Sequence, residues 1–200
     1  MARSTAQRSS GRRATQKKQG LSPLVIGLIV AAAVAVLALA GLWLSGALGG
    51  AAPGEKIEDM GAGLHLQQVN DPLPKPYNSY PPTSGYHYGG GTAPWGVLTQ
   101  PFPDALTVHN LEHGGVVIHY RQGTDQATIE KLTALTRQLQ QQNPCIVLQP
   151  RPADQLDVPI AVTAWTYLLK LNGLDEAAIT RFFRAHVGRG PEPVCPVGVQ

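Results

Sequence analysis

Hydrophobic and polar positions divide the chain into parts with different periodicities. Residues 24–44 (LVIGLIVAAAVAVLALAGLWL) are apolar almost without interruption and carry no charge. Residues 70–104 show no helical period, because prolines and glycines recur throughout them. Regular patterns return after this segment, so we expect the core of the folded domain to come from the C-terminal half of the chain.

Three short runs rich in β-branched and other apolar residues predict buried strands. Glycines and prolines bound these runs, as expected at strand ends. The predicted strands are residues 115–120 (GVVIHY), 145–149 (CIVLQ) and 159–165 (PIAVTAW), and the last could extend through Tyr167.

Two segments show the 3.6-residue period of amphipathic helices. In residues 125–142 the apolar face consists of Ile129, Leu132, Leu135 and Leu139, and Thr124 or Asp125 can cap the first turn. In residues 175–187 the buried stripe consists of Ile179, Phe182, Phe183 and His186. The β-α-β-β-α order predicts an α+β domain, a small sheet with both helices on one face.

The segment before these elements is expected to be an ordered loop. Residues 70–104 combine prolines and glycines with aromatic side chains, which argue against disorder. Residues 46–63 are small, polar and rich in turn formers, and are expected to be a linker. The folded domain is therefore predicted to span residues 64–200.

The uncharged segment predicts a membrane anchor. Its 21 residues would form a helix of about 31 Å, close to the hydrocarbon thickness of a bilayer, about 30 Å. The alternative is a cleaved signal peptide, whose apolar region is usually shorter. We expect a transmembrane helix over residues 21–45, with the lipid bilayer contacting residues 24–44. The basic residues before it place the N-terminus in the cytoplasm and the domain outside.

The charge distribution supports this topology. The chain has a net charge of +3 and a pI of about 9.0. The tail, residues 1–20, holds six basic residues and no acidic one, whereas the rest holds ten basic and thirteen acidic residues. The domain itself is therefore acidic, which argues against a nucleic-acid partner.

Cysteine usage agrees with export. Cys145 and Cys195 both lie in the predicted domain and are expected to form a disulfide in an oxidising compartment. A pair of metal-binding thiolates is the alternative, but the two cysteines lack the close spacing typical of such sites.

Histidines suggest a metal site. His109 and His113 are four residues apart, so one helical turn would place both imidazoles on one face, with Glu112 beside them. His87 follows a proline-rich turn and could converge on the same point. These four residues form a candidate site for copper or zinc. His65 and Met60 could extend it. The alternative is that the histidines bond backbone carbonyls and pin the loop.

An enzymatic role is not favoured. The string His109-x-x-Glu112-His113 matches the H-x-x-E-H signature of inverted zinc proteases. Gly114 and Gly115 follow at once, so no sustained helix is expected to direct the glutamate at a metal-bound water. The chain contains no Gly-rich phosphate loop and no nucleophile elbow, and we assign no catalytic residue.

Two motifs carry a family resemblance. PPTSGYH at residues 81–87 and VHNLEHGG at residues 108–115, with Ala164-Trp165 and Gly190-Pro191-Glu192, resemble the bacterial domain-of-unknown-function family 3105 over about residues 64–195. The resemblance implies a fold and a location, since members often carry an N-terminal membrane span. It implies no catalytic residue.

Two hypotheses follow from the sequence. The first is a membrane-anchored extracytoplasmic domain that binds copper or zinc through His87, His109, His113 and Glu112. The second is a metal-free interaction module or accessory subunit, which docks on a membrane protein partner and uses the histidines as internal struts.

Overall fold

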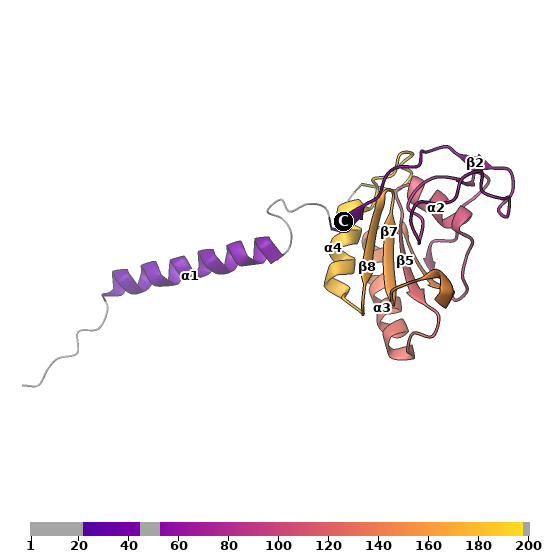
Figure 1. Cartoon of the computed structure of the whole chain (residues 1–200). Coiled ribbons are helices and arrows are strands. Elements are labelled where there is room, and N and C mark those ends of the chain that lie inside the picture. Colours follow the sequence, from indigo (N-terminus) through magenta and orange to yellow (C-terminus); the bar gives the residue numbers. More distant parts are fainter. Residues whose placement is uncertain (1–21, 45–52, 198–200) are drawn as a thin grey trace, which may run out of the picture. The chain divides into compact units, whose positions relative to one another are not determined.

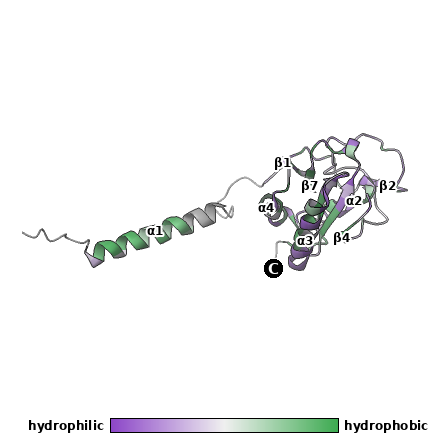
Figure 2. Cartoon of the chain, turned by 90° about the horizontal axis from the view of Figure 1, so that it is seen from below, coloured by the Kyte–Doolittle hydropathy of each residue, from purple (hydrophilic) through white to green (hydrophobic). Residues whose placement is uncertain are grey.

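The computed structural model describes residues 22–44 and 53–197, excluding the side chains of residues 39–44. The chain forms two compact units, residues 1–48 and 49–200, and each is described here by itself. In the first, α1 (Pro23–Leu44) covers the uncharged residues 24–44 and is hydrophobic where its side chains are described (Figures 1 and 2). Within the described ranges, no helix has both the length and the apolar character needed to cross a membrane. The basic tail and residues 46–52 of the predicted linker lie outside the described residues.

The second unit is built on a mixed six-stranded sheet in the order β1-β8-β7-β5-β6-β4. Its neighbouring strands β8, β7 and β5 are labelled in Figure 1. The central strand β5 pairs in parallel with β6 and antiparallel with β7. A separate pair, β2 (His65–Leu66) and β3 (His87–Tyr88), runs parallel. The strands of the large sheet are β1 (Glu55–Lys56), β4 (Gly96–Val97), β5 (Val116–Arg121), β6 (Ile146–Arg151), β7 (Ile160–Ala164) and β8 (Tyr167–Leu171).

Two helices, α3 (Gln126–Gln142) and α4 (Glu176–His186), cover one face of this sheet. Asp125 and Asp175 cap their N-termini, each accepting a hydrogen bond from a backbone N–H three residues later. The apolar stripes predicted for both helices pack on alternate residues of β5, β6 and β7, forming the main hydrophobic core. The predicted α+β architecture with two helices on one face is confirmed.

The opposite face is covered by α2 (Asp104–Glu112) and by the long segment that precedes it. Val108 and Leu111 of α2 pack on Val117 and Val147 of the sheet. The segment contains two-residue strands and turns, yet side chains such as Thr83 and Ser84 are fully buried. The proline-rich region is therefore an ordered cover, as expected.

Three features differ from the sequence-based expectation. The sequence predicted at most one helical turn around His109, but α2 has nine residues. The third predicted strand ends at Ala164, because Trp165 and Thr166 form a hairpin turn in which Thr166 has φ 60°, and β8 follows as a separate strand. Glu55–Lys56, placed in the linker, pair with β8, so the folded unit extends N-terminal of residue 64.

Cys145 and Cys195 form the predicted disulfide. It ties residues 188–196, called the C-terminal strap here, to the start of β6. A short 3-10 helix, η1 (Ala153–Gln155), follows β6. The strap reaches the end of α2 through backbone hydrogen bonds.

Candidate metal centre

The end of α2 is held in place by the C-terminal strap. The backbone N–H of Glu192 donates to the carbonyl of Glu112, and those of Val194 and Cys195 donate to the carbonyl of His113. The approach is so close that a Cβ at Gly190 would collide with the Glu112 carbonyl oxygen. This packing satisfies carbonyls that a helix end would otherwise leave without partners. It also fixes the side chains of the last helical turn.

The small parallel pair β2–β3 brings two more histidines to this point. His65 and His87 are register partners, and their ring centroids lie 4.9 Å apart in an edge-to-face arrangement. The His87 side chain is fully buried, whereas that of His65 is 48% exposed. The His65 ring leaves no room for a Cβ at Gly89, which explains a glycine there. The pair therefore joins a buried imidazole to one that reaches solvent.

Glu112 points from α2 at both rings. Its Oε2 lies 2.7 Å from Nε2 of His87 and 4.0 Å from Nε2 of His65. Its Oε1 accepts a 2.6 Å hydrogen bond from the backbone N–H of Gly63. The Glu112 side chain is fully buried. One nitrogen from each histidine and one carboxylate oxygen lie within 4.8 Å of one another, a group that could hold a metal ion.

The contact between His87 and Glu112 is not a hydrogen bond. Nδ1 of His87 lies 2.9 Å from the carbonyl oxygen of Gly85, which can only accept, so Nδ1 carries the ring proton. In the neutral ring, Nε2 then presents a lone pair to a carboxylate oxygen. Neither Nε2 of His87 nor Oε2 of Glu112 has a hydrogen-bond partner. With His87 neutral and Glu112 ionised, these two buried acceptors at 2.7 Å repel unless a proton or a metal ion lies between them.

Burial favours the neutral form of His87. Loss of solvent lowers the pKa of its imidazole below 6.5, and neighbouring His109 and His65 act in the same direction. The hydrogen bond to Gly85 and the charge of Glu112 raise the pKa and only partly oppose this effect. A neutral imidazole with Nδ1–H bonded to a carbonyl is the form in which histidine usually binds metals through Nε2.

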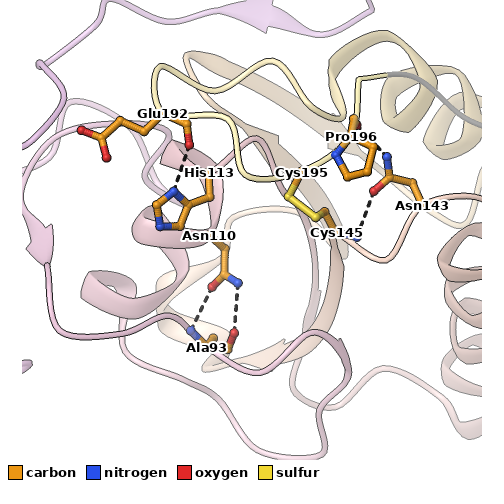
Figure 3. The surroundings of a disulfide bond; sticks show 8 residues. All are labelled: Ala93, Asn110, His113, Asn143, Cys145, Glu192, Cys195 and Pro196. Carbon is orange, nitrogen blue, oxygen red and sulfur yellow. Dashed lines mark hydrogen bonds between the residues drawn. A yellow bond between two sulfur atoms is a disulfide. The ribbon is translucent and has the colours of Figure 1, made fainter.

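His109 and His113 continue the cluster away from Glu112. The His109 ring centroid lies 5.0 Å from that of His87 and 4.4 Å from that of His113. Nδ1 of His109 donates to the carbonyl of Gly91, and Nδ1 of His113 donates to the carbonyl of Glu192 (Figure 3). In the neutral rings, both Nε2 atoms are thus free to act as ligands.

The four residues predicted as ligands therefore lie in one contiguous cluster. The candidate three-ligand group, however, takes His87 and Glu112 from that set and His65 as its third member. His65 had only been considered as an extension of the site. Its two-residue strand gives no periodic signal, and its pairing with His87 joins segments more than twenty residues apart. The other possible extension, Met60, lies beside Gly85.

The two remaining histidines have structural partners elsewhere. Nε2 of His119 lies 3.2 Å from the Thr163 hydroxyl, and its Nδ1 accepts from the amide of Gln149. Nε2 of His186 donates to the carbonyl of Pro53. These rings stabilise the fold, and neither belongs to the cluster.

Comparison with known proteins gives one match. A family model described as "Protein of unknown function (DUF3105)" matches residues 71–197. No curated protein matches the chain, and no solved structure matches it. The matched range includes His87, His109, Glu112 and His113 but begins after His65.

Proposed function

Because the chain belongs to the DUF3105 family, whose description assigns no activity, we propose a function from the site itself. The protein is a membrane-anchored extracytoplasmic domain that binds a zinc or copper ion through His65, His87 and Glu112. The observation that carries the proposal is the buried contact of 2.7 Å between Nε2 of His87 and Oε2 of Glu112, neither of which has a hydrogen-bond partner in the described residues.

The ligand set suits zinc and copper(II). Two imidazoles and one carboxylate are donors that both ions accept, and the group contains no thiolate that would favour copper(I). Three protein ligands leave a coordination position open on a tetrahedral ion. Neighbouring ligand atoms on such an ion lie about 3.3 Å apart, between the 2.7 Å and 4.0 Å separations measured from Oε2 of Glu112. The exposed His65 ring provides an entry path from solvent.

The sequence and the disulfide support the proposed anchoring and location. The uncharged residues 24–44, preceded by a basic tail, favour a single span with the N-terminus in the cytoplasm. A disulfide is expected to persist in an oxidising compartment outside the cytoplasm. Extraction of membranes with alkaline carbonate tests the anchor: the chain is expected in the pellet, and recovery in the supernatant would contradict it.

Metal content tests the site. We expect the full chain, purified without a histidine tag in mild detergent, to retain zinc or copper after dialysis, as measured by elemental analysis. His87→Asn keeps a donor for the Gly85 carbonyl but removes the Nε2 lone pair, so retained metal should fall at least tenfold. Glu130→Gln, which neutralises an exposed carboxylate on α3, is the matched control and should change nothing.

The alternative, a metal-free interaction module, makes the opposite prediction. If the histidines only pin the loop, the wild-type chain takes up neither zinc nor copper at micromolar concentration, and it is recovered with a membrane protein partner. Absence of metal binding in a correctly folded chain would reject the proposal.

A further inference from the structure

A second pair of histidines remains outside the His65–His87–Glu112 group. His109 and His113 lie one helical turn apart, since the N–H of His113 donates to the carbonyl of His109. His109 is nearly buried and His113 is partly exposed. Each has its Nδ1 proton engaged by a backbone carbonyl, so in the neutral rings both Nε2 atoms carry lone pairs. The two rings are fixed by different segments, the glycine-rich loop and the C-terminal strap.

The distance between the two rings fits a shared ion. Two imidazoles on one zinc ion, with Zn–N bonds of about 2.0–2.1 Å, place their centroids about 4.5–5.3 Å apart at bond angles of about 90–110°. The His109–His113 separation of 4.4 Å is just below this range, so a small ring rotation brings the pair into it. His65 and His109 are 6.3 Å apart and fall outside it. The His87–His109 separation of 5.0 Å also falls within the range, but Nε2 of His87 faces Glu112, so His113 is the partner left for His109.

The pair also faces open space. His109 and His113 line a cavity of about 340 Å³ whose other walls include Gly89–Gly91, Trp95 and the Cys145–Cys195 disulfide. A cavity of this size holds the water ligands that an ion bound by only two side chains needs. A Cβ added at Gly91 would meet no atom within 4 Å, so the loop leaves this space clear.

We infer that His109 and His113 form a second, outward-facing binding site for a zinc or copper(II) ion, distinct from the inner group at Glu112. The outer site has no carboxylate ligand and keeps positions open to solvent, so it binds more weakly and exchanges faster than the inner one. It does not require the inner site to be filled. The His109 ring lies 5.0 Å from that of His87, so an ion released from the outer pair is adjacent to the inner ligands.

A zinc titration of the untagged full chain in detergent tests this inference. The protein is stripped with a chelator and titrated against a chromophoric zinc chelator that competes for the ion. Two zinc ions per chain are expected, the second bound at least tenfold more weakly. His113→Asn keeps a donor for the Glu192 carbonyl but lacks Nε2, and should remove only the weaker ion. Glu130→Gln serves again as the control and should retain both.

His87→Asn separates this inference from the proposed function. If the variant loses the tight ion and keeps the weaker one, both sites are supported, and the retained ion shows that the variant is folded. If wild type binds one ion that His87→Asn abolishes and His113→Asn leaves, the outer site is rejected while the inner site stands. If the single ion is lost in His113→Asn and kept in His87→Asn, the outer site stands and the proposed inner site fails.

Discussion

The two faces of the central sheet differ in the kinds of side chain that they bury. On one face, α3 and α4 bury leucine, isoleucine and phenylalanine against β5, β6 and β7. On the other, a smaller apolar cluster shares the space with buried polar groups, among them His87, Asn110 and Glu112. The apolar face stabilises the fold by removing hydrocarbon from water. The polar side chains on the other face contribute little free energy of folding by being buried, so their burial depends on the stability that the apolar face provides.

The polar face is held together by hydrogen bonds instead of a regular core. Asn110 bonds both backbone groups of Ala93 through its side-chain amide (Figure 3). The Asp104 carboxylate accepts two hydrogen bonds from Arg151. Such groups are costly when a partner is missing, so the unpartnered His87–Glu112 contact stands out against its surroundings.

The largest loss of stability is expected for a substitution on the apolar face. Phe182 is fully buried in the main core, so Phe182→Ala should lower the free energy of unfolding by about 3–5 kcal/mol, through lost burial and a new cavity. Urea denaturation measures it, with the exposed Val194→Ala as a control expected within about 0.5 kcal/mol. A loss below about 1 kcal/mol would show that this face is not the main source of stability.

The disulfide connects the two faces, because Cys145 lies in the main core and Cys195 in the strap that holds α2. The double variant Cys145→Ser/Cys195→Ser should lose about 2–4 kcal/mol in urea denaturation, since the unfolded chain is no longer constrained by a 50-residue separation. It should also weaken zinc binding at His109–His113 more than at His65–His87–Glu112. Equal weakening of both would contradict the role given to the strap.

Acid should destabilise the metal-free protein. Burial holds the folded-state pKa of His186 below 6.5, so the unfolded chain binds a proton first as the pH falls. The contribution of His186 to stability is therefore complete above pH 6.5 and declines between pH 6.5 and its lower folded-state pKa, by at most about 1.4 kcal/mol per pH unit, and buried His87 and His119 add to the slope in the same direction. His186→Gln, which keeps a donor for Pro53, should flatten this slope in urea denaturation. An unchanged slope would contradict the contribution assigned to His186.

At the metal centre we expect a smaller change in the free energy of unfolding, an increase instead of a decrease. In Glu112→Gln the amide nitrogen replaces Oε2 and can donate to Nε2 of His87, while the amide oxygen still accepts from Gly63. We expect the metal-free variant to be more stable than wild type by about 1 kcal/mol in urea, and to lose the inner ion. A destabilisation of that size would instead indicate that His87 and Glu112 form a stabilising ion pair.

The sequence predicted the apolar face better than the polar one. The periodicities of residues 125–142 and 175–187 identified the buried side of each helix, because one face of a helix packs on one sheet. The helix around His109 was underestimated, since apolar and polar residues are both buried along its nine residues and give no clear amphipathic period. The pairing of His65 with His87 depends on long-range backbone contacts, for which local patterns carry no signal.

X-ray absorption spectroscopy at the zinc edge tests the central claim most directly. The untagged full chain, loaded with one equivalent of zinc to fill the tighter site, should show nitrogen and oxygen ligands at about 2.0–2.1 Å with the scattering signature of two imidazoles. In His87→Asn one imidazole should disappear from the inner-site spectrum or the zinc should be lost. A shell of oxygen ligands without imidazole in the wild-type protein would contradict the account.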